Sequence, residues 1–313
     1  MKKNTGKETT LSQCDTGKPE QDNEWGPHEG TRELRGAKDS DSLGNGSAIS
    51  KGSQEWWQNF FDDDWKRFSF DAHRAEQTSR QVDFIIEALY IKKEEQVLDL
   101  CCGIGRHAIE LAKRGFKHII GQDFCKEYLE HAASEAEREG LKLDLIESDM
   151  RRIPGYGKLD AIYSWHTSFG YFETEGENEK VIDAVGGALR QGGRFLLDLN
   201  NRDWIIRNFA AQTWHGEEPN NYILENNRFD LATSIHHGEW TFISEDGTKK
   251  TRRMQLRQYS LHEMISLLAR YGLRFVNVWG SIEKEPLSLN SRRMIILAVK
   301  GEVSCKSIAR ELR

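Results

Sequence analysis

The segment from 97 to 107, VLDLCCGIGRH, is an apolar run that enters a glycine-bearing turn and continues as a helical pattern. Gly103 and Gly105 lack side chains where a ligand must touch the backbone and where the next helix must pack closely. Asp123 ends a second strand pattern about 20 residues after Gly103, where a carboxylate can bind both hydroxyls of an adenosine ribose. A structural turn would explain the glycines alone, but the strand, the helix and the acid together predict a site for a nucleoside cofactor.

The glycines do not decide which nucleoside cofactor binds, because residues 103–108 also match the dinucleotide fingerprint G-x-G-x-x-G/A. Three features outside the turn favour a cofactor without phosphates. Asp99 lies in the strand just ahead of the turn, Asp149 ends a third strand pattern, and Asp160 opens a fourth in LDAIYSW. The sequence also has no G-x-x-x-x-G-K-[ST] loop, which argues against a nucleoside triphosphate.

With these features the chain resembles the class I S-adenosylmethionine-dependent methyltransferases, whose first motif reads acid-x-small-x-Gly-x-Gly, from about residue 80 to 300. The resemblance implies that Asp99 lies near the aminopropyl tail of the methionine moiety, that the 101–105 turn wraps this moiety, and that Asp123 binds the ribose. Asp149 and the Met150 backbone would bind the adenine. Cys101 stands where glycine is commonest in the family. The cofactor-binding residues that we expect are Asp99, Cys101, Gly103, Gly105, Asp123, Phe124, Asp149, Met150 and Trp165.

The chemistry of S-adenosyl-L-methionine fits these residue types, because the molecule carries an ammonium group and no phosphate. Its sulfonium methyl is already a strong electrophile, so the protein must mainly hold a nucleophile in line with the S–CH3 bond. A general base is needed only if the acceptor loses a proton early. We therefore expect direct transfer that leaves S-adenosyl-L-homocysteine, with no metal. The five cysteines, which show no zinc spacing, agree with this: Cys14, Cys101, Cys102, Cys125 and Cys305.

The acceptor site is expected after the fourth strand, where the sequence reads WHTSFGYF from 165 to 172. Its TSFGYF part is similar to segments of small-molecule N- and O-methyltransferases, including those acting on amino sugars. His166 and Tyr171 are the catalytic candidates, although His166 could instead cap or pack against the adenine. Ordinary helix packing would equally explain the aromatic residues. The residues that we expect to contact the acceptor are Phe169, Asn200 and Trp240.

The elements that must position these residues alternate between strand and helix from about 75 to 200, which predicts a doubly wound, mostly parallel seven-stranded α/β sheet. Residues 221–259 alternate in strand-length runs broken at 226–227, 238 and 246–247, which predicts an antiparallel β appendage inserted after the fifth strand. The expected strands are 97–101, 118–122, 143–147, 160–165 and 193–199, and the expected helices are 78–89, 106–114, 126–139, 177–190 and 261–271.

The chain thus divides into five predicted parts. Residues 1–53 are polar and poor in apolar side chains, which predicts a disordered tail. Residues 54–202 form the cofactor-binding core, 203–259 the appendage that covers the acceptor, 260–300 the closing helix and β-hairpin, and 301–313 a C-terminal tail. The appendage could serve as a homodimer interface instead of a lid.

The composition limits the classes of molecule that the protein is expected to bind. A net charge of -6 and a pI of about 6.0 give no general attraction to nucleic acid. No apolar run approaches the ~20 residues of a membrane span, so we expect a cytoplasmic protein. The acceptor that we expect is a small molecule. RNA methylation, protein methylation and a non-catalytic cofactor-binding subunit remain as alternatives. RNA is suggested by the basic residues Lys249, Lys250, Arg252, Arg253, Arg257, Arg292 and Arg293.

Overall fold

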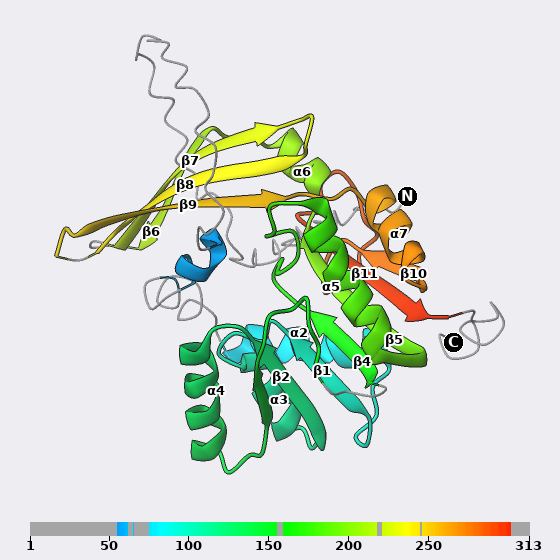
Figure 1. Ribbon diagram of the computed structural model, residues 1–313. Coiled ribbons are helices and arrows are strands. Elements are labelled where there is room, and N and C mark those ends of the chain that lie inside the picture. The colour runs from blue at the N-terminus through cyan, green and yellow to red at the C-terminus, as the bar shows by residue number, and fades with distance from the viewer. Residues whose placement is uncertain are drawn as a thin grey trace, which may run out of the picture. The chain divides into compact units, whose positions relative to one another are not determined.

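The computed structural model describes residues 55–61, 65, 75–154, 159–217, 221–244 and 246–301 (Figure 1). The tail predicted at 1–53 and residues 302–313 lie outside the described residues. The described residues all belong to one compact unit, which spans Asp39–Arg313. Among them, no helix combines the length and apolar character needed to cross a membrane.

A seven-stranded sheet forms the centre of this unit, with the strand order β10-β11-β5-β4-β1-β2-β3, which confirms the predicted fold class. Strands β1 to β5 are parallel, whereas β11 runs antiparallel to both β5 and β10. The order reverses beside β1, which pairs with β2 on one side and β4 on the other. The strands of the seven-stranded sheet are β1 (Gln96–Leu100), β2 (His118–Asp123), β3 (Asp144–Glu147), β4 (Leu159–Ser164), β5 (Leu189–Asn200), β10 (Leu273–Trp279) and β11 (Arg293–Lys300).

Helices cover both faces of this sheet, which explains why its central strands are apolar without alternation. Val97 and Leu98 follow each other in β1 and are both fully buried, but they belong to different core clusters. Val97 packs with α2 and α3, and Leu98 packs with α5 and α7. The helices are α2 (Ala75–Leu89), α3 (Arg106–Lys113), α4 (Lys126–Arg138), α5 (Glu175–Ala188), α6 (Arg202–Arg207) and α7 (Leu261–Arg270).

The end of α5 corrects one sequence prediction. The helix was expected at 177–190, but it ends at Ala188 and β5 begins at the next residue. Gly192 and Gly193 lie within β5, where the pairing with β4 shifts register. Gly192 has a φ of 74°, and a Cβ on Gly193 would lie 2.8 Å from the Arg190 carbonyl oxygen. The two glycines therefore allow a local irregularity in the strand.

The appendage is a separate four-stranded antiparallel sheet of β6 (Gln212–Glu217), β7 (Asn221–Asp230), β8 (Ile235–Ile243) and β9 (Lys249–Arg257) (Figure 1). The breaks predicted at 226–227 and 238 are wrong, because both positions lie inside continuous strands. The chain turns at 231–234 instead. A Cβ on Gly238 would lie 2.7 Å from Trp240 Nε1, so this glycine makes room for the indole. Strand β6 and helix α6 were not predicted.

A short 3-10 helix, η1 (Trp56–Asn59), begins the described chain and packs on the appendage. Phe60 is buried with Met254 and Leu256 of β9. The Trp240 ring lies 5.8 Å from that of Phe60 and 5.7 Å from that of Trp65. Residues 55–61 and 65, called here the N-terminal segment, are thus joined to the second sheet through aromatic contacts.

Gly105 lies at the start of α3 and packs against Ala132 of α4. Its replacement tests that contact. Its φ is 73°, and a Cβ there would lie 2.8 Å from Ala132 Cβ in α4. Gly105→Ala should therefore lower the free energy of unfolding by more than the about 1–2 kcal/mol that a left-handed residue costs. Gly140 is the matched control, because it has a φ of 66° and no atom near its Cβ position. Urea denaturation that gave equal losses for Gly105→Ala and Gly140→Ala would show that the Ala132 contact is unimportant.

Candidate functional site

A cavity opens at the carboxyl ends of β1, β2 and β4, the position at which doubly wound sheets bind ligands. It encloses about 1030 Å³, including its open mouth. The lining residues are Trp57, Phe61, Trp65, Asp99, Cys101, Cys102, Gly103, Arg106, His107, Gln122, Asp123, Phe124, Tyr128, Ser148, Asp149, Met150, Trp165, His166, Ser168, Tyr171 and Phe172. Of the residues predicted from the sequence, four do not line it: Gly105, Phe169, Asn200 and Trp240.

Asp99, the second-last residue of β1, contributes a buried carboxyl. Only 1% of its surface is exposed, and its Oδ2 accepts no hydrogen bond from any described residue. Burial raises the pKa of Asp99 to about 7, and the Tyr163 hydroxyl, the Arg106 guanidinium and the Ala108 N–H offset this rise only in part. A cation placed beside Oδ2 would favour the ionised form and supply the missing partner.

The turn after β1 is clamped by the carboxylate of Asp123 at the end of β2. Gly103 N donates to Asp123 Oδ2 at 2.8 Å, and Cys125 N donates to Oδ1 at 3.0 Å. Burial raises the pKa of this carboxyl, although both backbone N–H groups oppose the rise. Each carboxylate oxygen keeps a second lone pair, so Asp123 can still accept hydrogen bonds from a diol.

Cys101 shows why glycine is common at the first position of this turn. Its φ is 64°, in the left-handed region that L-residues with a Cβ rarely adopt. Burial raises the pKa of the Cys101 thiol well above its usual range. The side chain is therefore a protonated, packed group at the cavity wall and not a nucleophile.

Asp149 lines the cavity, but its carboxylate is already bound by Arg151, which the sequence analysis missed. Arg151 Nε lies 3.1 Å from Asp149 Oδ1 and 3.0 Å from Oδ2. The same guanidinium donates to Glu55 Oε2 at 3.0 Å and to Glu177 Oε2 at 2.6 Å, and it lies 4.1 Å from the centre of the Phe172 ring. Burial alone would lower the pKa of Arg151, but the hydrogen bonds to these three carboxylates raise it.

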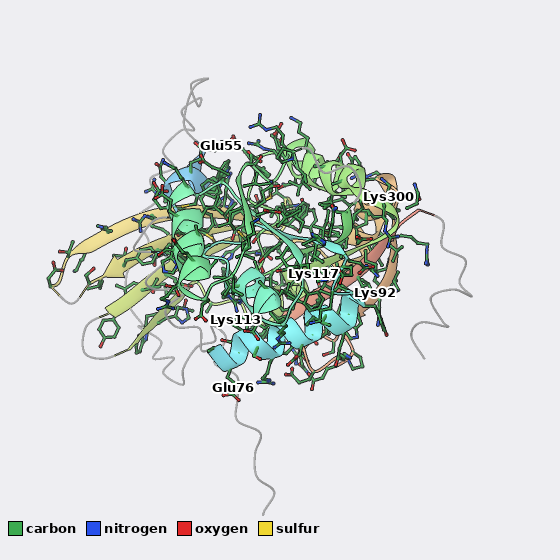
Figure 2. The ribbon with its side chains drawn as sticks, turned by 90° about the horizontal axis from the view of Figure 1, so that it is seen from below. Glu55, Glu76, Lys92, Lys113, Lys117 and Lys300 are labelled. Atoms are coloured by element: carbon green, nitrogen blue, oxygen red, sulfur yellow. The ribbon has the colours of Figure 1, made fainter. Side chains whose placement is uncertain are left out.

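Arg151 therefore ties the N-terminal segment, with Glu55 at its start (Figure 2), to the cavity floor. Trp57 of this segment lies 4.7 Å from Phe124 and 5.8 Å from Phe172 between ring centres. Phe61 lies 5.5 Å from Tyr171. The sequence did not predict Trp57 and Phe61 as cavity residues. The aromatic run WWQNFF from 56 to 61, directly after a polar tail, is a signal that could have found them.

His166 and Thr167, which follow β4, are consecutive residues with left-handed backbones, at φ values of 64° and 58°. The buried Asp198 holds both. His166 N donates to Asp198 Oδ2 at 2.9 Å, and Thr167 N donates to the Asp198 carbonyl oxygen at 3.0 Å. Arg293 Nε donates to Asp198 Oδ1 at 2.9 Å. Such strain persists only where neighbouring groups enforce it, and it is common at functional sites.

The other predicted catalytic residue, Tyr171, lies between Trp56 and Phe61, with ring centres 5.5 Å from each. Burial raises the pKa of its phenol, so the hydroxyl stays protonated and could act as a donor but not as a base.

Three residues predicted to contact the acceptor do not line the first cavity. Phe169 is 2% exposed and packs against Tyr259 at 5.1 Å between ring centres. Asn200 Oδ1 accepts from Arg293 Nη1 at 2.6 Å. Trp240 packs on Phe60 and on Trp65, which lines this cavity.

A second cavity adjoins the first, with Trp57 and Tyr171 lining both. It is more polar, and residues of the N-terminal segment, β7, β8 and β9 surround it. His237 lines it, whereas the neighbouring His236 bonds Asn227 Oδ1 at 3.1 Å and stacks on Phe229. Burial and the nearby Arg228 lower the pKa of His237. The residues around it are Glu55, Trp56, Trp57, Tyr171, Glu173, Asn226, Arg228, His237, Gly238, Glu239, Arg253, Met254 and Gln255.

Comparison with known proteins agrees with this geometry. Residues 97–193 match the family described as a methyltransferase domain. A putative methyltransferase from Geobacillus sp. (strain WCH70) is 25% identical over 66% of this chain and 85% of its own length. A glycine/sarcosine N-methyltransferase from Halorhodospira halochloris is 29% identical over 40% of this chain and 47% of its own length.

Two solved structures share the fold. An S-adenosylmethionine-dependent methyltransferase from Clostridium acetobutylicum has a TM-score of 0.66 at 20% identity, covering 76% of this chain and 96% of that one. An amino pentose methyltransferase from Micromonospora echinaspora, solved with its cofactor bound, has a TM-score of 0.56 at 19% identity, covering 77% and 97%.

Replacing Arg151 should release the N-terminal segment. In Arg151→Met the carboxylates of Asp149, Glu55 and Glu177 lose their shared cation and are left close together, so the segment should open at least about tenfold more often. Limited chymotrypsin digestion measures this as faster cleavage between Trp56 and Phe61.

The neighbouring Arg152 gives the matched control, because its side chain is exposed. Arg152→Met should be cleaved at the wild-type rate. Equal cleavage of the wild type and Arg151→Met would mean that the aromatic contacts alone hold the segment.

Proposed function

Because the chain belongs to the class I S-adenosylmethionine-dependent methyltransferases, we propose that it transfers the methyl group to a small-molecule acceptor, at nitrogen or oxygen. The chain is an enzyme, and S-adenosylmethionine is its cofactor. The observation that carries the proposal of a small acceptor is the second cavity, which meets the first at Trp57 and Tyr171.

The residues of the first cavity fit this cofactor. Asp99, buried with an unsatisfied Oδ2, suits the ammonium group of the methionine moiety. Asp123 keeps lone pairs for the ribose hydroxyls. Trp57 and Phe124 offer apolar surface for the adenine, and Asp149 and Met150 line the same cavity. Among the described residues, no group of three or more His, Cys, Asp or Glu side chains could hold a metal ion.

When bound, S-adenosylmethionine supplies an electrophilic methyl group on a positively charged sulfur. The work left to the protein is positioning and exclusion of water. Phe61, Trp65 and Tyr171 line the cavity with aromatic rings, and ring faces also favour a cation electrostatically. His166 lines the cavity on its strained loop, where it could accept a proton from a hydroxyl acceptor. An amine acceptor that arrives deprotonated needs no such base.

The polar groups of the second cavity favour a small, polar acceptor. Carboxylates, guanidinium groups and an imidazole lie around it, from Glu55, Glu173, Arg228, Arg253 and His237. Such a mixture can pair with an amine and with hydroxyl or carboxylate groups on the same molecule. The relatives named for methylating glycine and sarcosine, and the structural neighbour named for an amino pentose, act on molecules of this size and polarity.

Some of the basic residues that suggested RNA bind partners within the fold. Arg257 pairs with Glu263, and Arg293 pairs with the buried Asp198. Arg292 lies 5.2 Å from the Trp204 ring centre. These contacts favour a small acceptor over a nucleic acid. The cytoplasmic location and a homodimer stay predictions.

The cofactor should bind more tightly as the pH rises towards neutrality, because the ammonium group requires ionised Asp99. Below pH 7 the carboxyl, whose pKa is about 7, holds a proton that binding must displace. Affinity for S-adenosylhomocysteine should therefore rise about tenfold from pH 5.5 to 7. Isothermal titration measures this. Asp99→Asn should bind weakly with a flat profile, and a sloping profile in that variant would assign the effect to another group.

Screening small metabolites, tRNA, rRNA and protein with a labelled methyl group tests the acceptor class. Label should enter a polar small molecule. Transfer to RNA or protein with none to metabolites would contradict the proposal.

With that acceptor, His237→Ala should raise the Michaelis constant about fivefold or more, since His237 lines only the second cavity. Affinity for S-adenosylhomocysteine should stay within about twofold. His236→Ala is the matched control, because this side chain is directed to Asn227 and Phe229 instead. Equal effects of the two variants would show that the second cavity does not receive the acceptor.

A further inference from the structure

Two of the acids that line the second cavity are already bonded to arginines. Glu55 Oε2 accepts a hydrogen bond from Arg151 Nη2 at 3.0 Å. Glu239 Oε2 accepts one from Arg253 Nε at 2.9 Å, between the neighbouring strands β8 and β9. The charges of these two acids are therefore offset by groups of the protein itself.

Two further charged side chains, Arg228 of β7 and Glu173, line the same cavity without such a bond. Neither side chain forms a hydrogen bond or an ion pair within the described part of the chain. Asp230 lies two residues from Arg228, but its Oδ1 accepts the Ala232 N–H at 2.9 Å in the turn that follows β7. The cavity thus presents a cation and an anion that no direct bond to a described residue satisfies.

Arg228 and His237 face the second cavity together. They lie opposite each other in the pairing of β7 with β8, so their side chains project to the same face of the sheet. Burial and the Arg228 guanidinium lower the pKa of His237, so its imidazole adds a hydrogen-bonding group and no charge at neutral pH. One guanidinium beside a neutral imidazole matches a singly charged carboxylate, whereas a doubly charged phosphate would exceed it.

Charges without a partner select among ligands because binding removes their water. Arg228 and Glu173 are exposed, so water solvates both in the free protein. A neutral acceptor would displace this water without replacing its bonds, and a simple amine would bring a second cation near Arg228. A molecule with both an amine and a carboxylate pairs with the two side chains at once.

We propose that the methyl acceptor is an amine that also carries a carboxylate, with Arg228 binding the carboxylate and Glu173 the amine. This inference rests on the proposed function, and it names the class of small molecule that the second cavity receives. Glu173 follows Tyr171 by two residues, and Tyr171 lines both cavities. The amine is therefore assigned to the group nearer in sequence to the junction with the first cavity, which agrees with transfer to nitrogen.

The acceptor that the labelled-methyl screen identifies tests this class directly. It should contain an amine and a carboxylate. Steady-state kinetics then compare this acid with its primary amide, which keeps the size of the molecule and loses the negative charge. The wild type should have a Michaelis constant about tenfold to hundredfold higher for the amide, because a hydrogen bond between charged groups is lost.

Replacing the two side chains should separate their roles. Arg228→Gln should raise the Michaelis constant of the acid about tenfold and leave that of the amide within about twofold. Arg228→Lys should keep part of the preference, since the charge remains without the two-bond geometry. Glu173→Gln should weaken the acid and the amide alike, because both keep the amine. In all three variants the affinity for S-adenosylhomocysteine should stay within about twofold, which also shows that they are folded.

The matched control is Lys249→Gln, which removes one positive charge from the same sheet. Lys249 is exposed at the start of β9 and does not line the second cavity. This variant should keep the wild-type preference for the acid. Equal losses in Arg228→Gln and Lys249→Gln would assign the effect to the general charge of the appendage and overturn the proposed contact.

Two outcomes of the screen have different consequences. A small acceptor without a carboxylate would overturn this inference and leave the proposed function intact. Transfer of the label to RNA or protein alone would contradict the proposed function itself. An acid–amide preference that is unchanged in Arg228→Gln would show that another group binds the carboxylate.

Discussion

The carboxylate of Asp123 joins the ends of two adjacent parallel strands, and the cavity depends on this connection. One oxygen accepts the N–H of Gly103 in the turn after β1, and the other accepts the N–H of Cys125 at the start of α4. Parallel strands present their carboxyl ends at a common edge, but nothing in the ladder itself fixes the loops that leave them. A buried carboxylate that bonds both loops does so, and burial makes loss of either bond costly.

The cavity has a second boundary that comes from far away in the sequence. Arg151 forms ion pairs with three carboxylates. Asp149 lines the cavity, Glu55 belongs to the N-terminal segment and Glu177 lies near the start of α5, so one cation connects these three places. Trp56 Nε1 donates to the Tyr171 carbonyl oxygen at 3.1 Å, across 115 residues of chain. These bonds hold the N-terminal segment beside the first cavity.

Two of the six described non-glycine residues with left-handed backbones, Cys101 and His166, line the first cavity, and Thr167 follows His166 directly. Each such residue costs of order 1–3 kcal/mol. The ion pair of Arg293 with buried Asp198 holds the His166 loop, and it comes from β11 and β5, the antiparallel end of the sheet. Strand β11 therefore stabilises the His166 loop at the wall of the first cavity.

The sequence by itself determined the sheet, the positions of its strands and the acids at their carboxyl ends. The expected strand at 97–101 is observed at Gln96–Leu100, and the expected helix at 126–139 at Lys126–Arg138. These signals are local, because a strand buried on both faces must be an apolar run and a ligand-bearing turn must begin where it ends.

Only the tertiary structure decided what closes the cavity and which groups pair there. The sequence predicted Gly105 as a ligand contact, but the fold places it against Ala132 of α4. It predicted Phe169 and Trp240 at the acceptor, but they pack against Tyr259 and Phe60 and do not line the first cavity. Arg151 was not predicted, because two of its three carboxylate partners are distant in the chain, with Glu55 at 96 residues and Glu177 at 26. Periodicity reports which face of an element is buried, whereas the choice of partner across that face depends on how the elements pack.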